Sequence, residues 1–226
     1  MKPTIYAEFN PWEDTEIDLP YDNISLAIDK IKYSRKADCR ILYLIEPIEV
    51  LPRINERALR RGNEFDIIYT TNTALLEKYS HSYLFEYGTS WLDFNSLKIN
   101  KLKQITFITS SKSSTFGQKL RQEIYRMIKS KIYINDLNLF CHKSPPFYPN
   151  RNDFFSSASF HIAVENTKQD NWFTEKLIDC FITKTIPIYF GCPNLENWFD
   201  LSGVLTFNNL DELSEILSNL TSNLYY

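Results

Sequence analysis

Short apolar segments alternate with helix-like segments along most of this chain. The strand-sized segments include ILYLI (41–45), FDIIYT (65–70), QITFIT (104–109), FHIAV (160–164) and TIPIYF (185–190). Between them, segments such as 53–61 and 115–128 carry apolar residues at helical spacing. Strands that alternate with helices favour parallel sheets with helical crossovers. The pattern therefore predicts an α/β fold with two Rossmann-like units, residues 1–100 and 101–226, joined through the polar stretch 88–101.

The remaining elements are expected from shorter patterns. Ile24, Ala27, Ile28 and Ile31 have helical spacing and predict a helix over 23–36. Thr174 is the expected N-cap of a helix over 175–183. Further strands are expected at 4–9, 82–87, 132–134 and 203–207, and further helices at 74–79, at 153–158 and after Asn209.

Composition and motifs exclude several classes of protein. The net charge of -3 gives no basic surface for nucleic acid, and no apolar run approaches the length of a membrane span. With no N-terminal signal region, the expected location is cytoplasmic, with peripheral attachment to a membrane left open. The five glycines form neither GxGxxG nor a P-loop, no Asp-x-Asp occurs, and the three histidines lie far apart, so no cofactor and no divalent metal is expected. Cys39, Cys141, Cys180 and Cys192 are expected to be buried thiols.

A nucleotide-binding pattern follows the strand FHIAV. This strand delivers Glu165 and Asn166 to the carboxyl edge of a parallel sheet, where open α/β sheets bind ligands. The helix that begins after Thr174 offers free N–H groups to a phosphate. Glu175 suits two ribose hydroxyls, and Lys176 suits a phosphate. A purely structural explanation also exists, because the helix dipole alone favours Glu in a first turn, and Lys is usually solvated.

The segment from Asn150 to Asn194 resembles the donor-binding signature of the α-1,3-fucosyltransferases, glycosyltransferase family 10. The resemblance rests on ENx…TEK, on the helix that follows and on TIPIY-x-G. It implies a GT-B arrangement with an acceptor domain (1–100) and a GDP-sugar donor domain (101–226). It also implies that Asn166 and Lys176 contact the diphosphate of GDP-fucose and that Glu175 binds the ribose.

The resemblance extends to three further residues. Trp172 stands where the family usually has Tyr, and its indole is expected to stack on the nucleotide or donate its N–H. Arg121 matches an Arg that clamps the phosphates from the first helix of the donor domain, although a solvated Arg on an amphipathic helix is the alternative. Glu46, directly after ILYLI, resembles a family Glu and is the expected base for the acceptor hydroxyl. Glu49 is its rival, and a solvated Glu before a proline turn is the structural alternative.

The resemblance implies an inverting transfer of fucose from GDP-fucose to a glycan hydroxyl. The implied acceptor is a sugar of a lipopolysaccharide, a capsule or a similar oligosaccharide. Two alternatives stay open: a related transferase with another nucleotide-sugar donor, and a non-catalytic protein that binds nucleotide sugars. The N-terminal half matches the family thinly, and acceptor recognition is expected to lie there.

Overall fold

The computed structural model describes residues 4–7, 23–130, 138–143 and 151–220, with the strand at 138–143 described by its backbone. The chain divides into two compact units, Met1–Glu86 and Tyr87–Tyr226. The sequence places the division after residue 100. The difference arises because residues 87–100 carry side chains that hydrogen-bond to the second unit, among them Tyr87 and Ser90.

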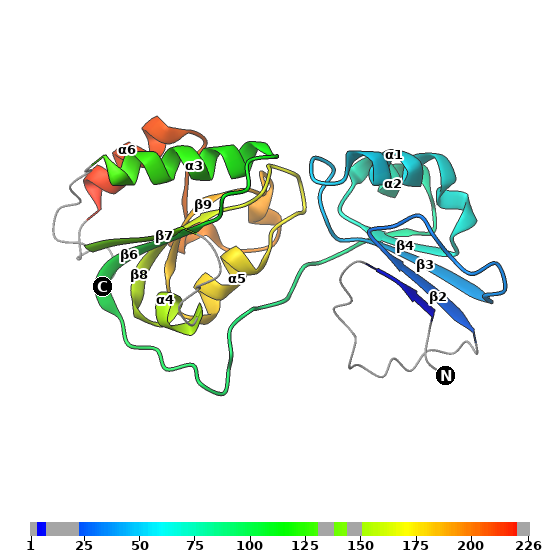
Figure 1. Cartoon of the computed structure of the whole chain (residues 1–226), viewed down its shortest axis with the longest axis horizontal. Helices are drawn as coiled ribbons and strands as arrows, with labels where there is room; N and C mark the ends of the chain where they lie inside the picture. Colours follow the sequence, from blue (N-terminus) through cyan, green and yellow to red (C-terminus); the bar gives the residue numbers. More distant parts are fainter. Residues whose placement is uncertain (1–3, 8–22, 131–137, 144–150, 221–226) are drawn as a thin grey trace. The chain divides into compact units, whose positions relative to one another are not determined.

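The first unit holds a parallel sheet of five strands in the order β1-β2-β3-β4-β5. Its elements are β1 (Thr4–Tyr6), β2 (Ile24–Ile28), β3 (Cys39–Leu44), α1 (Pro52–Arg61), a 3₁₀ turn (Gly62–Glu64), β4 (Ile67–Thr70), α2 (Thr73–Lys78) and β5 (Ser82–Leu84). Each strand pairs with the next strand in the sequence. Because right-handed crossovers that always advance in one direction return over the same face, both helices lie on one face of this sheet (Figure 1).

The two faces of the first sheet differ accordingly. Ala58 of α1 and Leu75 of α2 pack with Leu42, Ile68 and neighbouring residues into one buried cluster. On the opposite face, a second cluster contains strand residues such as Leu26 and Ile41. In the described ranges no helix contributes to that second cluster.

The helix predicted over 23–36 is wrong. Ile24–Ile28 forms strand β2, and all five of its residues are buried. The strand is buried along its whole length and is apolar except at Ser25, so its residues also satisfy the i, i+3, i+4 spacing of a helix. The strand ends at Ile28, and the next residue, Asp29, has a φ of 51°, in the left-handed region.

The second unit also holds a parallel sheet of five strands, in the order β10-β9-β8-β6-β7. Its elements are β6 (Leu102–Thr109), α3 (Phe116–Lys129), β7 (Asn138–Lys143), α4 (Arg151–Ser157), β8 (Ala158–Val164), α5 (Glu175–Ile182), β9 (Ile186–Phe190), 3₁₀ turns at Leu195–Asn197 and Leu201–Gly203, β10 (Leu205–Thr206) and α6 (Leu210–Asn219). The predicted strand at 132–134 lies outside the described residues, and β7 was not predicted.

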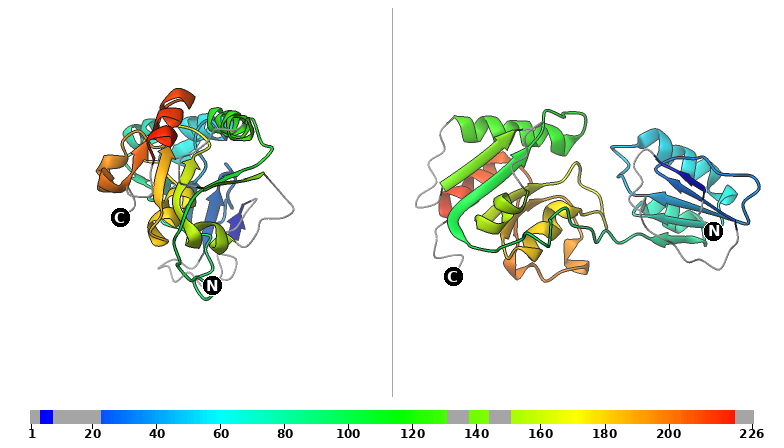
Figure 2. Two further views of the ribbon diagram at one scale, coloured as in Figure 1. Left: turned by 90° about the vertical axis from the view of Figure 1, so that its left-hand side faces the viewer. Right: turned by 60° about the horizontal axis from the view of Figure 1, so that its bottom comes forward.

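The strand order of the second sheet reverses at β6. The chain passes from β6 to β7 on one side and then to β8 on the other side of β6. The crossovers therefore cover both faces, with α3 and α6 on one face and α4 and α5 on the other (Figures 1 and 2). Leu120, Ile124 and Leu213 fill the first layer, and Phe155, Leu177 and Cys180 fill the second. The reversal places a switch point between the carboxyl ends of β6 and β8, where open α/β sheets bind ligands.

The expected burial of the cysteines is confirmed for the three whose side chains are described. Cys39, Cys180 and Cys192 are free and buried. The side chain of Cys141 lies outside the described part. No helix within the described ranges combines the length and the apolar character that a bilayer crossing needs.

Candidate functional site

The first turn of α3 lies against the loop that follows β8. The backbone N–H of Gly117 donates to the carbonyl of Asn166 over 2.9 Å. A Cβ at position 117 would overlap the backbone oxygen of Glu165, so only glycine permits this approach. Thr115 caps α3 in a capping box with Gln118. The helix N-terminus is thereby held at the switch point of the sheet.

Arg121 and Asn166 meet at this contact. Arg121 lies one helical turn after Gly117 and is buried, with 9% of its surface exposed. One of its terminal nitrogens donates to Oδ1 of Asn166 over 2.6 Å. The structure therefore brings together two residues that the resemblance to glycosyltransferase family 10 assigns to the donor diphosphate.

The N-terminus of α5 is fixed by a buried carboxylate. Glu165, which is fully buried, accepts hydrogen bonds from the backbone N–H of Thr174 (2.8 Å) and from its hydroxyl (2.8 and 3.0 Å). Thr174 is the N-cap of α5, as predicted. Burial raises the pKa of Glu165, although the charge of Lys176, whose Nζ lies 3.4 Å from Oε2, opposes this shift. The sequence placed Glu165 at the strand end but did not predict that it holds the cap.

Lys176 lies among oxygen atoms of three residues. Its Nζ is 2.9 Å from the Thr174 hydroxyl and 3.1 Å from Oε1 of Glu175. Burial lowers the pKa of Lys176, but the carboxylates of Glu165 and Glu175 outweigh burial, and the pKa is raised above its ordinary value. For Glu175 the directions are reversed: burial raises its pKa, but the positive charges of Lys176 and Arg151 hold the pKa below its ordinary value. Lys176 is therefore a cation and Glu175 an anion at neutral pH.

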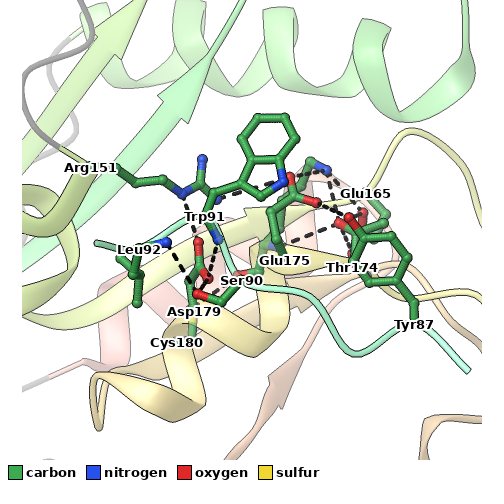
Figure 3. Close-up of polar contacts among 11 residues, drawn as sticks. Tyr87, Ser90, Trp91, Leu92, Arg151, Glu165, Thr174, Glu175, Asp179 and Cys180 are labelled. Atoms are coloured by element: carbon green, nitrogen blue, oxygen red, sulfur yellow. Dashed lines mark hydrogen bonds and ion pairs between the residues drawn. The ribbon is translucent and has the colours of Figure 1, made fainter. Parts of the chain in front are cut away.

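Glu175 belongs to a larger polar cluster (Figure 3). The hydroxyl of Tyr87 donates to Oε2 of Glu175 over 3.2 Å, and a terminal nitrogen of Arg151 lies 4.0 Å from Oε1. One turn further along α5, Asp179 forms a 2.7 Å ion pair with Nε of Arg151. Tyr87, Arg151 and Asp179 were not predicted from the sequence. The spacing of four residues between Glu175 and Asp179 was the available signal, because it places both carboxylates on one side of a helix.

The structure also describes two further predicted site residues, Trp172 and Glu46. Trp172 is buried, with 2% exposed, so its contact with a nucleotide stays a prediction. Glu46 follows β3 in the first unit and is half-buried, whereas its rival Glu49 is exposed. The backbone N–H of Glu46 donates to Oδ1 of Asp29 over 3.2 Å. The end of β3 is thus fixed by Asp29, which supports the expectation that Glu46 is better positioned than Glu49.

The arrangement in the second unit suits an anionic ligand. Arg121 and Lys176 are close enough for the charge of Arg121 to act on the pKa of Lys176. Both cations belong to helices that begin at the carboxyl edge of the sheet, where free N–H groups favour phosphate. Across the residues that the structure describes, no cluster of three or more His, Cys, Asp or Glu could hold a metal ion. The chemistry that these side chains offer is phosphate and hydroxyl binding.

Comparison with known proteins identifies the family. The model of the C-terminal region of glycosyltransferase family 10 (fucosyltransferase) matches residues 99–225, more than half of the chain. An α-(1,3)-fucosyltransferase of Helicobacter pylori, FucT, is 36% identical over 74 residues, which are 31% of this chain and 16% of that protein. Alpha-(1,3)-fucosyltransferase B of Drosophila melanogaster is 31% identical over 113 residues, 48% of this chain and 23% of that protein. The matched segments thus span less than a quarter of these two relatives.

A solved structure gives the same answer for the fold. The crystal structure of an α1,3-fucosyltransferase with GDP-fucose superimposes with a TM-score of 0.54 and 16% identity, over 89% of this chain and 67% of that chain. The predicted GT-B-like fold class, two Rossmann-like units with parallel sheets, is confirmed. Because the family model covers the segment that builds the site, the chain belongs to glycosyltransferase family 10.

Proposed function

We propose that this chain transfers fucose from GDP-fucose to a hydroxyl of a glycan, with inversion at the transferred carbon. The observation that supports this most is the 2.6 Å hydrogen bond between Arg121 and Asn166 at the switch point of the second sheet, with Lys176 near enough for the charge of Arg121 to act on its pKa. These are the residues that the family signature assigns to the donor diphosphate. The relatives named fucosyltransferases and the GDP-fucose complex of a structural neighbour support the choice of donor.

Each donor-site residue has a proposed role. Arg121 and Lys176 neutralise the diphosphate, and the Asn166 amide together with the N-termini of α3 and α5 adds hydrogen bonds. Glu175, which is anionic at neutral pH, accepts hydrogen bonds from the ribose hydroxyls. Thr174 keeps α5 in place beneath the diphosphate through its bonds to Glu165.

The chemical step is a single displacement. The acceptor oxygen attacks C1 of fucose while the bond from C1 to the phosphate oxygen breaks, and the electron pair of that bond leaves with GDP. Glu46 takes the proton of the acceptor hydroxyl. Arg121 and Lys176 stabilise the negative charge that develops on the leaving GDP. Because these two cations neutralise the negative charge on the leaving GDP, we propose that transfer needs no divalent metal. Full activity in excess EDTA is the expected result.

Calorimetric titration tests the nucleotide site. Wild-type protein is titrated with GDP, GDP-fucose, GDP-mannose and UDP, beside Lys176→Ala and the control Lys129→Ala, which removes an exposed lysine at the opposite end of α3. We expect binding of the guanine nucleotides and none of UDP. Lys176→Ala should weaken GDP binding at least ten-fold, since a hydrogen bond to a charged group contributes about 1.5–3 kcal/mol. If the wild type binds no guanine nucleotide, the proposed function is wrong, and tighter binding of GDP-mannose would assign a different donor sugar.

A pair of glutamine variants tests the base. Glu46→Gln should lower the transfer rate about 100-fold or more while GDP still binds, because general base catalysis contributes roughly that factor. Glu49→Gln is the matched control, and we expect it to retain transfer. Equal losses in both variants would contradict the assignment of Glu46. Donor binding without transfer by the wild type would favour a non-catalytic nucleotide-sugar-binding protein.

A further inference from the structure

The segment 87–96, which we call the strap, belongs structurally to the second unit. The side chain of Leu92 is buried in the cluster beneath α5. Asn152 of α4 donates to the carbonyl of Asp93 (2.7 Å) and to the Ser96 hydroxyl (3.0 Å), and it accepts from the Asp93 backbone N–H (3.0 Å). The strap is therefore fastened at its far end by residues that do not touch Glu175.

Asp179 fastens the other end of the strap. Its side chain is fully buried. Oδ1 accepts from the Ser90 hydroxyl (2.6 Å) and from the backbone N–H of Trp91 (3.3 Å). Oδ2 accepts from Nε of Arg151 (2.7 Å). A single carboxylate thus joins three segments: α5, the first turn of α4, and the strap.

The two segments that Asp179 holds are the two that reach Glu175. The strap carries Tyr87, whose hydroxyl donates to Oε2 of Glu175, and Arg151 approaches Oε1 from α4 (Figure 3). Arg151 is also confined between aromatic rings, since its guanidinium carbon lies 5.3 Å from the ring centroids of both Trp91 and Phe155. Both oxygens of Glu175 therefore have a defined direction before any ligand binds. Tyr87 and Lys176 occupy two of the about four lone-pair sites of the ionised carboxylate, and Arg151 at 4.0 Å lies beyond hydrogen-bond distance, so Glu175 can still accept from two hydroxyls.

Burial makes the cluster sensitive to the loss of one member. Burial raises the pKa of Asp179, and the charge of Arg151 opposes that shift. Removal of one partner of a buried ion pair leaves the other charge without compensation. The neutral variant Asp179→Asn therefore frees Arg151 and loosens the turn at Ser90 and Trp91.

We propose that Asp179 is a positioning residue of the donor site: by holding Arg151 and the strap, it orients the Glu175 carboxylate toward the two hydroxyls of the nucleotide ribose. The proposal rests on the proposed function, because it takes a ribose as the group that Glu175 binds. Asp179 itself does not touch the ligand. Its effect reaches the ribose through Tyr87 and Arg151.

The test compares GDP with 2′-deoxy-GDP by calorimetric titration. The two nucleotides differ in one ribose hydroxyl, so the ratio of their dissociation constants isolates the contact with Glu175. For the wild type we expect GDP to bind about ten-fold more tightly, the lower end of the range for a hydrogen bond to a charged group. Asp179→Asn should reduce this preference to about two-fold, mainly by weakening GDP. A merely structural role for Asp179 would weaken both nucleotides equally and leave the ratio unchanged.

Two further variants keep the test decisive if Asp179→Asn fails to fold. Tyr87→Phe removes only the hydroxyl that contacts Glu175, and Arg151→Lys keeps the charge but loses the fork that joins Asp179 to Glu175. Both should lower the GDP preference, whereas Asp153→Asn, an exposed acid on α4, is the charge-matched control and should keep it. An unchanged preference in Tyr87→Phe and Arg151→Lys would overturn the proposal.

The outcomes separate this inference from the function on which it rests. Wild-type protein that binds GDP with a clear preference over 2′-deoxy-GDP supports the proposed function, and the variants then decide the role of Asp179. Wild-type protein that binds both nucleotides equally overturns the ribose role of Glu175, and with it this inference, while the diphosphate site stands. No GDP binding at all overturns both.

Discussion

Each unit has a sheet of five parallel strands, but the two sheets differ in strand order. In the first unit every strand pairs with the next one, whereas in the second unit the order reverses at β6. The reversal has two effects. It covers both faces of the second sheet with helices, and it opens a switch point at which α3 and the loop after β8 meet. The first unit has no reversal, and the described part of one face carries no helix.

The comparison explains why the proposed donor-binding residues gather in one unit. A reversal separates the loops at adjacent strand ends, so side chains from two helices can point into the same space. Arg121 of α3 and Lys176 of α5 are such a pair. In the first unit the strand ends offer single positions, of which Glu46 after β3 is an example. Strand order thus limits which unit can bind an extended anionic ligand.

The largest expected effect comes from cutting the chain at two different points. The fragment 87–226 keeps the strap, whereas the fragment 101–226 loses it. We expect the shorter fragment to be less stable by about 4 kcal/mol or more, because it loses the buried Leu92 and two hydrogen-bond partners of the buried Asp179, Ser90 and Trp91. Urea unfolding of both fragments measures the difference. Equal midpoints would show that residues 87–100 are not part of the second unit.

The next effect concerns the close contact at the switch point. Gly117→Ala should destabilise the second unit by about 3 kcal/mol and abolish GDP binding, because the new methyl group meets backbone atoms that cannot turn aside. Gly203→Ala is the control, since no atom lies within 4 Å of a Cβ there, and its cost should stay within about 0.5 kcal/mol. The melting temperature and GDP titration of both variants give the answer. Near-normal binding by Gly117→Ala would mean that α3 can shift without harm to the site.

A third prediction uses acid to weaken the second unit. Burial between the sheet and α4, together with the charges of Arg151 and Lys101, lowers the pKa of His161 to about 3. The unfolded chain binds a proton at this residue below pH 6.5, whereas the folded chain does not until about pH 3. Stability is therefore present above pH 6.5 and is lost as the pH falls, by about 1.4 kcal/mol for each pH unit.

The variant His161→Gln checks this sign. Its free energy of unfolding should depend less steeply on pH between 6.5 and 4 than that of the wild type. Identical slopes for the variant and the wild type would contradict the prediction.

The smallest effect is expected on the face of the first sheet that carries no helix among the described residues. Tyr43, Tyr69 and Tyr83 form a row across β3, β4 and β5, with ring centroids 4.7 and 5.9 Å apart. Tyr83 is 52% exposed, so Tyr83→Ala should cost no more than about 1 kcal/mol. Ile68→Ala, on the helix-covered face, should cost about 2–5 kcal/mol. Similar costs in urea unfolding would show that both faces are packed equally tightly.

Much of the fold follows from local patterns, and the failures have physical causes. The strands around Ile41 and Phe160 and the helix that begins after Thr115 are where the sequence predicts them, because length and capping residues identify them. Strand β2 was mistaken for a helix because it is buried throughout and apolar except at Ser25, a pattern that also fits helical spacing. The sequence placed the division after residue 100 and the structure places it after Glu86, because the polar stretch 87–100 resembles a linker in the sequence. In the structure its polar groups bind α4 and α5.

The candidate site was predictable where a motif lies within one segment. Glu175 and Lys176 are neighbours in the sequence, and their position at a helix start follows from Thr174. Tyr87 and Asp179 lie 92 positions apart in sequence numbering, and no local pattern reveals that both act on one carboxylate. Contacts of that kind depend on how the chain returns to the same edge, which only the three-dimensional fold supplies.

The exposed indole of Trp91 makes the strap observable by tryptophan fluorescence. Trp91 is 62% exposed and lies against the Arg151 guanidinium, whereas Trp172 is buried. Indole fluorescence moves to longer wavelength in water and responds to nearby charge, so these two side chains should emit at opposite ends of the tryptophan range. A displacement of Arg151 when a nucleotide binds would change the red-edge emission. The chain also contains Trp12 and Trp198, so the contribution of Trp91 is the part of the red-edge change that is lost in Trp91→Phe. The protein therefore carries an intrinsic optical reporter beside its candidate donor site, and no label is needed to follow occupancy in real time.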